Sequence, residues 1–115
     1  MDLSSEPIRQ DVADTAPLTR REIADLLPGV PGWSLEDRRL VARFACKSFC
    51  DAVAFLQDVA RLSAQESHYP DMSIRRGRTV DVAWYTYAIG GLSRNDFIMA
   101  ARLSERLRYQ QSAGL

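Results

Sequence analysis

The chain has 115 residues, of which 46% are hydrophobic and 26% charged, values typical of one soluble globular domain. Positive and negative side chains balance at 15 each, so composition gives no general attraction to nucleic acid or to an anionic membrane. No apolar run approaches the roughly 20 residues that span a bilayer. The first ten residues also lack the apolar core of a signal peptide. A cytoplasmic location is therefore expected.

The two ends of the chain lack the patterning of a folded domain. Residues 1–16 show no apolar periodicity and are rich in polar residues, which predicts a flexible N-terminal tail. The domain is expected over residues 17–110, and residues 111–115 are expected to fray.

Three helices are predicted from their first turns and from apolar residues at helical spacing. Each begins with a Ser or Thr followed three residues later by a carboxylate, the spacing of a capping box: Thr19 with Glu22, Ser48 with Asp51, and Ser93 with Asp96. Pro28 and Gly29 end the first helix, and the second runs to about Ser67. The third runs to about residue 110.

Two strand pairs separate these helices. Strands are expected at residues 33–35 and 40–45 and at residues 72–75 and 79–87. In the last strand Val80, Val82 and Trp84 should face the core, and Asp81, Ala83, Tyr85 and Tyr87 should face a half-exposed side.

The element order α-β-β-α-β-β-α predicts an α+β domain with two layers, a four-stranded antiparallel sheet with three helices on one face. Such a sheet leaves edges and one bare face, so we expect a homodimer or a dimer of dimers.

The cysteines, Cys46 and Cys50, read as small hydrophobic residues rather than a disulfide in a reducing compartment. Further ligands at metal-like spacing are lacking, so no metal and no cofactor are expected.

His68 is the only histidine, and it lies where a helix gives way to an extended segment. A histidine at such a corner can act as a general acid or base, since its unperturbed pKa of about 6.5 is close to cellular pH. It can equally cap the last carbonyls of the helix, aided by the negative end of the helix dipole. The position of His68 in the sequence does not by itself distinguish these two roles.

The sequence resembles the pterin-4a-carbinolamine dehydratase family from about Leu18 to Arg108. The matching pieces are Leu18–Glu22, Leu26–Pro28, Gly32–Trp33, the strand around Phe44, the helix Phe49–Leu62, His68–Asp71 and Gly91–Asp96. The resemblance implies the same α+β fold and assembly into dimers and tetramers.

The family's catalytic signature is a His-His-Pro corner and a third histidine just before the last helix, and these groups dehydrate a 4a-hydroxy pterin. Residue by residue, the resemblance matches His68 to the first histidine and Pro70 to the proline. Tyr69 and Tyr87 replace the other two histidines. Ala64 replaces the acidic residue that usually precedes the corner by four positions, whereas the aspartate of the last helix is kept as Asp96.

These replacements bear on the reaction, because eliminating water needs one group that takes a proton and another that gives one. Tyrosine, with a pKa near 10, is a poor base at neutral pH. Loss of one positioned acid or base typically costs about 10² to 10⁴ in rate. A capping box explains Asp96 fully. Catalytic residues are therefore not expected, with His68 the one candidate if the protein is active.

Tyr69, Tyr85 and Tyr87 are expected to gather with His68 at a vestigial pocket, as binding anchors or as a cover of the sheet within an oligomer. The family has a branch that lacks the catalytic histidines and assists assembly of ribulose bisphosphate carboxylase (Rubisco) in α-carboxysome bacteria. The resemblance to that branch implies a chaperone for Rubisco subunits, in the cytoplasm or associated with carboxysomes. The alternatives are 4a-hydroxytetrahydrobiopterin dehydratase, a lyase of tetrahydropterin recycling, and a dimerisation module for a transcription factor.

Overall fold

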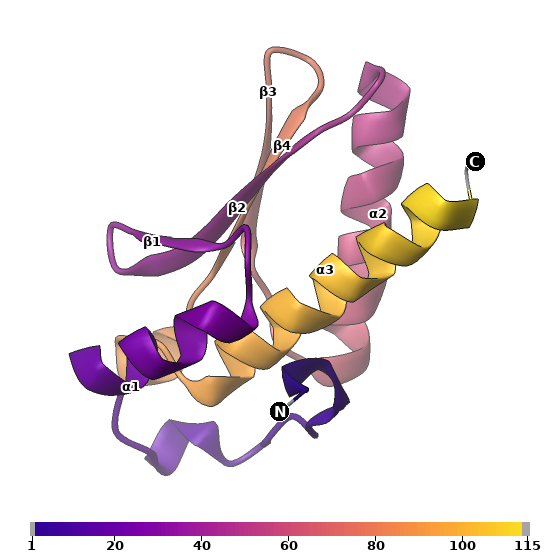
Figure 1. Cartoon of the computed structure of the whole chain (residues 1–115). Coiled ribbons are helices and arrows are strands. Elements are labelled where there is room, and N and C mark those ends of the chain that lie inside the picture. The colour runs from indigo at the N-terminus through magenta and orange to yellow at the C-terminus, as the bar shows by residue number, and fades with distance from the viewer. Residues whose placement is uncertain (1, 114–115) are drawn as a thin grey trace.

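In the computed structural model, which describes residues 2–113, the chain forms three α-helices and a four-stranded antiparallel sheet (Figure 1). The helices are α1 (Arg20–Leu26), α2 (Phe49–Glu66) and α3 (Arg94–Ala113). The strands are β1 (Ser34–Glu36), β2 (Arg39–Ala45), β3 (Asp71–Arg75) and β4 (Thr79–Trp84). The predicted α+β class is confirmed.

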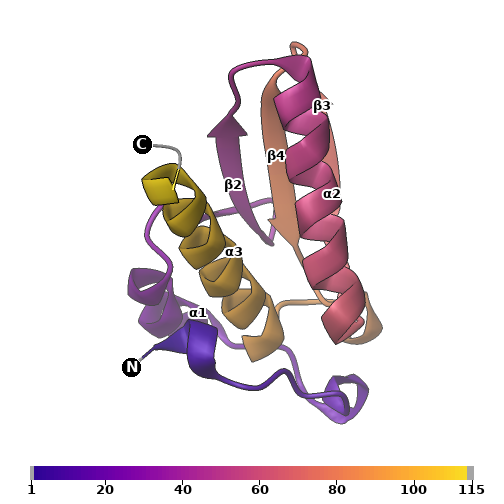
Figure 2. The same cartoon turned by 90° about the vertical axis from the view of Figure 1, so that its right-hand side faces the viewer.

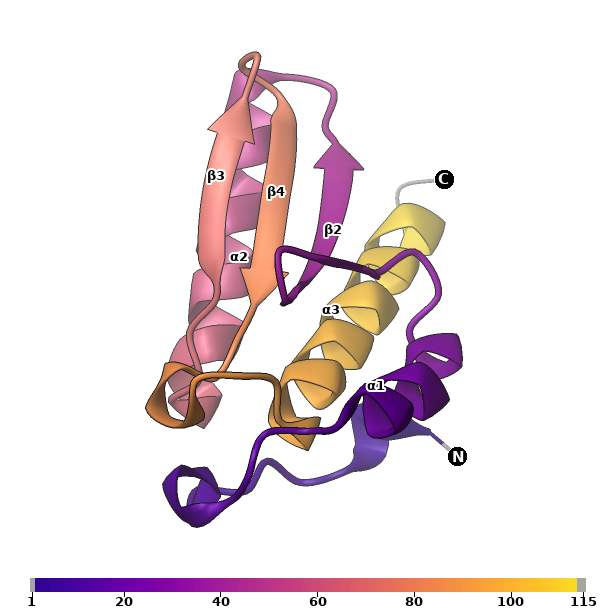
Figure 3. The same ribbon diagram turned by 90° about the vertical axis from the view of Figure 1, so that its left-hand side faces the viewer.

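The sheet has the order β1-β2-β4-β3, so the two hairpins meet at its centre through β2 and β4. In that central pair Leu40 lies opposite Trp84 and Phe44 lies opposite Val80. Side chains alternate between faces along a strand, so these residues share one face. Helices α2 and α3 lie over it (Figure 2), and the opposite view shows the strands β2, β3 and β4 uncovered in the described part of the chain (Figure 3).

The core forms between this face and the two long helices. Val80, Val82 and Trp84 are fully buried, as predicted, and so are Phe97 and Leu103 of α3. Burying an aliphatic or aromatic side chain of this size contributes about 1.5–3 kcal/mol. The alternation along β4 therefore fixes which face the helices cover.

The predicted capping boxes form to different extents. At α1 both hydrogen bonds are present, between the Thr19 side chain and the Glu22 backbone and in the reverse direction. At α2 the Ser48 hydroxyl accepts from the Asp51 N–H at 3.1 Å. At the start of α3 the carboxylate of Asp96 accepts from the Ser93 N–H at 2.9 Å.

Strand β4 ends at Trp84, three residues before the predicted end of the strand at Tyr87. Thr86 forms an isolated bridge with Gly91, and the chain between them turns through the short 3₁₀ helix η4 (Tyr87–Ile89). Gly90 closes this turn with a φ of 66°, a conformation that suits glycine. Tyr87 therefore lies on a turn and not in the sheet.

The N-terminal segment is packed against α3, which differs from the predicted flexible tail. It forms two 3₁₀ turns, η1 (Leu3–Ser5) and η2 (Val12–Asp14), and the Leu3 side chain is 3% exposed. Arg94 donates to both oxygens of Glu6 at 2.6 and 2.8 Å, and Arg102 donates to the Glu6 carbonyl at 2.6 Å.

The Glu6–Arg94 contact has an electrostatic consequence. The hydrogen bond from Arg94 lowers the pKa of the Glu6 carboxyl group below its usual range. Arg94 and Arg102 lie on α3, more than 80 residues from Glu6 in the chain, so no local sequence pattern predicts these contacts.

At the C-terminus α3 continues through residues 111–113, which were expected to fray, and residues 114–115 lie outside the described part of the chain. Within residues 2–113, no helix has the combination of length and apolar character that crossing a bilayer requires.

Replacing Leu3 with alanine tests whether the packed N-terminal segment stabilises the domain. We expect Leu3→Ala to lower the free energy of unfolding by about 2 kcal/mol, because it leaves a cavity in the core. Urea denaturation measures this. Asp14→Ala, at an exposed position of the same segment, is the control and should change stability by less than about 0.5 kcal/mol. Equal, negligible effects of both variants would contradict the packed arrangement.

Candidate functional site

His68 directly follows the end of α2. Ser67 caps the helix in the left-handed conformation, with a φ of 52°. The His68 N–H then donates to the Ser63 carbonyl at 3.2 Å. Pro70 follows two residues later and cannot continue a helix. The sequence therefore turns the chain sharply at this corner and directs it into β3.

The imidazole of His68 lies between a buried carboxylate and a buried indole. Its Nε2 is 2.6 Å from Oδ1 of Asp96, which is completely buried. Its ring stacks on Trp84, with centroids 5.7 Å apart and planes 6° from parallel. The His68 side chain is 11% exposed. The indole N–H of Trp84 is buried and has no hydrogen-bond partner among the described residues.

Asp96 joins this corner to the start of α3. Its Oδ2 accepts from the Thr86 hydroxyl at 2.7 Å and from the Ser93 N–H at 2.9 Å. The hydroxyls of Thr86 and Ser93 lie 2.7 Å apart. The expectation that capping explains Asp96 fully is therefore wrong, because the same carboxylate also holds His68 and Thr86.

Tyr87 belongs to a second group of polar contacts. Its hydroxyl donates to Oδ2 of Asp71 at 2.6 Å and accepts from Nη2 of Arg39 at 3.1 Å. The Arg39 guanidinium lies 4.7 Å from the ring centroid of Tyr85 and 5.6 Å from that of Tyr87. The hydrogen bond with Tyr87 is the main cause that raises the pKa of Arg39 above its usual value. The Tyr87 hydroxyl is therefore held between the carboxylate of Asp71 and the guanidinium of Arg39.

The predicted site residues thus fall into two groups. His68 and Asp96 form one, and Tyr85 and Tyr87 form the other, with ring centroids 4.8 Å apart. Tyr85 is 8% exposed, whereas a half-exposed position was expected. Tyr69 is 63% exposed. Tyr69 makes no hydrogen bond or ring contact with either group within the described residues.

Pro70, half-buried, lies between the groups in sequence. Asp71, the next residue, belongs to the Tyr87 group and follows His68 by three positions. Both groups therefore meet at the corner between α2 and β3.

Arg39, Asp71 and Thr86 were not among the predicted site residues. Asp71 is part of the His68–Asp71 motif, so the sequence alone could have indicated it. Arg39 carried a weaker signal, because it lies next to the alternating strand that begins at Leu40. Thr86 was assigned to a strand, and only the bridge to Gly91 turns its hydroxyl toward Asp96.

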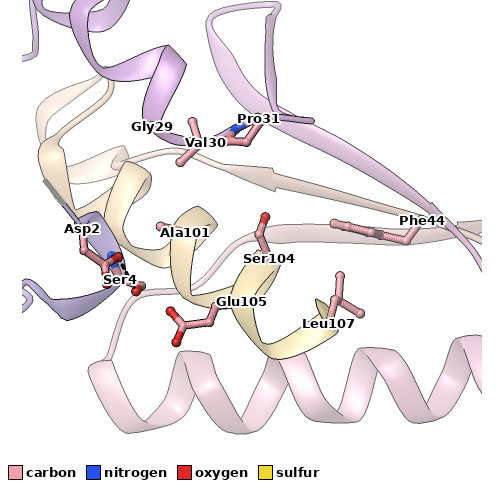
Figure 4. A pocket seen from close by; sticks show the side chains of 10 residues that line it. All are labelled: Asp2, Ser4, Gly29, Val30, Pro31, Phe44, Ala101, Ser104, Glu105 and Leu107. Atoms are coloured by element: carbon pink, nitrogen blue, oxygen red, sulfur yellow. Dashed lines mark hydrogen bonds between the residues drawn. The ribbon is translucent and has the colours of Figure 1, made fainter. Parts of the chain in front are cut away.

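Two hollows lie near these elements. One of about 310 Å³ opens on the uncovered sheet face, where Arg39 and Asp71 contribute to its wall. Another of about 410 Å³ lies between α3 and the turn at Gly29–Pro31 (Figure 4). None of the predicted site residues lines the second hollow. Within the described part of the chain, His, Cys, Asp and Glu side chains form no group of three that would suit a metal ion.

Comparison with known proteins agrees with this fold. A sequence profile described as "Pterin 4 alpha carbinolamine dehydratase" matches residues 16–106. The chain belongs to the pterin-4a-carbinolamine dehydratase family. A relative from Cupriavidus pinatubonensis, named "Putative pterin-4-alpha-carbinolamine dehydratase 1", is 43% identical over 91 residues, which are 77% of this chain and 78% of the relative.

Two further family members extend the comparison. A relative from Chlorobium luteolum, named "Putative pterin-4-alpha-carbinolamine dehydratase", is 42% identical over 77% of this chain and 81% of its own length. The crystal structure of a "transcriptional coactivator/pterin dehydratase" from Brucella melitensis superposes with a TM-score of 0.71 at 25% identity, covering 77% of this chain and 96% of that one. The matched family region therefore includes all four strands, α1, α2 and most of α3.

The contact between His68 and Asp96 yields a stability prediction. We expect His68→Ala to cost about 2 kcal/mol, because it removes a hydrogen bond to a buried charged group and the stacking on Trp84. Chemical denaturation measures this loss. Tyr69→Ala, one residue along at an exposed position, serves as the control and should change stability by no more than about 0.5 kcal/mol. A His68 variant as stable as wild type would mean that Asp96 does not depend on the imidazole.

Proposed function

We propose that this chain is a non-catalytic member of the dehydratase family that binds Rubisco subunits and assists their assembly in an α-carboxysome bacterium. The observation that carries the proposal is the replacement of two of the three signature histidines by Tyr69 and Tyr87. The hydroxyl of Tyr87 is engaged by Asp71 and Arg39, an arrangement that orders the ring and offers no base near neutral pH. The corner thus keeps its shape without two of the groups that move protons.

A binding role is supported by the exposure of the replaced positions. Tyr69 and Tyr87 are 63% and 59% exposed, and tyrosine offers a large rigid surface with one hydroxyl, which is common at protein interfaces. Rubisco as the client follows from the resemblance to the branch that has lost its catalytic histidines.

A refolding assay with Rubisco subunits tests this proposal. We expect added protein to raise the yield of assembled, active Rubisco, and Tyr69→Ala to weaken the effect about tenfold in concentration dependence, as for an interface anchor. Arg76→Ala, at the exposed turn at the far end of β3, should behave as wild type. A yield that does not respond to the protein would refute the proposed function.

Dehydratase activity is the second candidate, and the His68–Asp96 pair favours it. A carboxylate that holds one ring nitrogen of a histidine orients the imidazole, as in many sites where histidine acts as a base. The names of the relatives agree with this activity. The reaction also needs a group that protonates the departing hydroxyl, and the signature histidines that would supply it are absent.

Loss of 4a-hydroxytetrahydropterin, followed by absorbance, separates the two candidates. We expect wild-type turnover to stay within about tenfold of the uncatalysed rate, because two of the three signature histidines are replaced and the loss of each positioned acid or base typically costs about 10² to 10⁴ in rate. Catalysis well above that level, abolished by His68→Ala and retained by Tyr69→Ala, would establish the dehydratase and exclude a purely binding role for this corner.

We also propose that copies of the chain pair through the outer side of α2. Phe49 and Val53 lie one turn apart there and are 58% and 37% exposed. The Brucella protein is named a transcriptional coactivator, so a transcription factor is an alternative partner for this surface.

Phe49→Asp should therefore convert the dimer into monomers, as measured by sedimentation equilibrium, because an unpaired carboxylate in an apolar interface is strongly unfavourable. Gln65→Asp, at an exposed position more than four turns further along α2 and on another side of the helix, is the control. Unchanged association of Phe49→Asp would exclude this face.

A further inference from the structure

An apolar groove separates α1 from the β1–β2 hairpin. It measures about 640 Å³, and side chains from three segments line it: Leu18, Ile23, Leu27, Leu35 and Leu92, with Arg20 and Arg38 as its charged members. Leu35 is 45% exposed, although it lies opposite the buried Leu40 in the sheet. An exposed leucine beside partly buried ones is the pattern of a surface that a partner covers.

The segment before α1 holds one wall of the groove in place. The Leu18 N–H donates to the Leu92 carbonyl at 2.9 Å. Pro17 packs so closely on Gly91 that a Cβ at that glycine would lie 2.7 Å from the proline Cβ. The groove is therefore a fixed feature of the fold and not a gap between independent segments.

The two arginines of the groove have no carboxylate partner within the described residues. Asp37, next in the chain to Arg38, lies 3.7 Å from Arg39 instead. On α1 the Glu22 side chain is engaged by the Thr19 N–H at 2.9 Å, and it does not line the groove. An apolar floor with two free cations at its edge suits a ligand that is apolar and acidic.

Arg38 occupies a backbone position that favours glycine. Asp37 and Arg38 form the two-residue loop between the paired residues Glu36 and Arg39, with φ values of 49° and 62°. Two consecutive positive φ values in such a loop are typical of a type I′ turn, whose second residue is usually glycine. In the turn between β3 and β4, glycine does occupy the second left-handed position, Gly77 after Arg76. A residue held in a disfavoured conformation is common at functional positions.

We propose that this groove binds an acidic amphipathic helix of a partner protein. Apolar side chains of that helix pack on Leu27 and Leu35, and its carboxylates pair with Arg20 and Arg38. A helix suits the site better than an added strand, because β1 has only three residues and offers few backbone groups for pairing. The inference does not depend on Rubisco as the client, and it concerns a surface separate from the His68 corner.

Fluorescence polarisation with the full chain and a designed peptide tests the proposal. The probe is a labelled helix of about 15 residues with leucines at i, i+3, i+4 and i+7 and glutamates beside them. The matched peptide carries lysine at every glutamate position. We expect the acidic peptide to bind at least about tenfold more tightly than the basic one, with an affinity that falls as salt rises.

Variants then separate the arginines from general charge effects. R20E/R38E should weaken binding of the acidic peptide at least about tenfold, and R76E/R78E, the same charge change at the exposed turn between β3 and β4, should leave it unchanged. Arg38→Gly should weaken binding about threefold to fivefold. Its melting temperature should be equal to or above that of wild type, because glycine suits the turn. A purely structural arginine would give the opposite pair of results.

Several outcomes would overturn the proposal. Equal binding of both peptides, or binding that survives R20E/R38E, would remove the role of the arginines. Dissociation of oligomers by Leu35→Asp would assign the groove to a second copy of the chain. Binding of an oleate probe with no binding of either peptide would assign it to a lipid-like ligand. Failure of the Rubisco assay alone leaves these measurements intact, so the two proposals fail separately.

Discussion

Asp96 places a carboxylate, fully shielded from solvent, where three segments of the chain meet. It receives hydrogen bonds from the first turn of α3 and from Thr86, and it contacts His68 beyond the end of α2. A buried carboxylate is tolerated only when such partners replace its lost hydration. The positions of α2, α3 and the turn after β4 are therefore set together, because each supplies a partner that the others cannot replace.

This arrangement gives His68 a role in packing that does not depend on any reaction. The contacts of His68 with Asp96 and Trp84 bury the imidazole and help to hold the core, so the residue has a structural reason to be present. The positions occupied by Tyr69 and Tyr87 are on the surface, where a change of side chain does not disturb the core. At this corner the packing residues His68 and Asp96 are thus partly separate from the exposed positions 69 and 87.

Local patterns were enough to predict most of the fold. The capping residues Thr19 and Ser48 and the alternation of Val80, Val82 and Trp84 act within a few residues, and all of them mark elements that the structure contains. The failures have a different physical origin. Leu3 and Glu6 are ordered by α3, far away in the chain, and Asp96 acquires its second role only when the termini of two helices meet. Contacts of that kind leave no trace in local periodicity.

Gly91 gives the N-terminal segment an influence beyond its own stability. Since Pro17 fills the space that any side chain at this position would need, a larger residue there would have to push the proline outward. The displaced segment carries Leu18 with it, so the loop before α3 and the lining beside α1 would shift as one unit. A substitution at this single small residue would thus reshape the groove beside α1 and leave the helices and the sheet as they are.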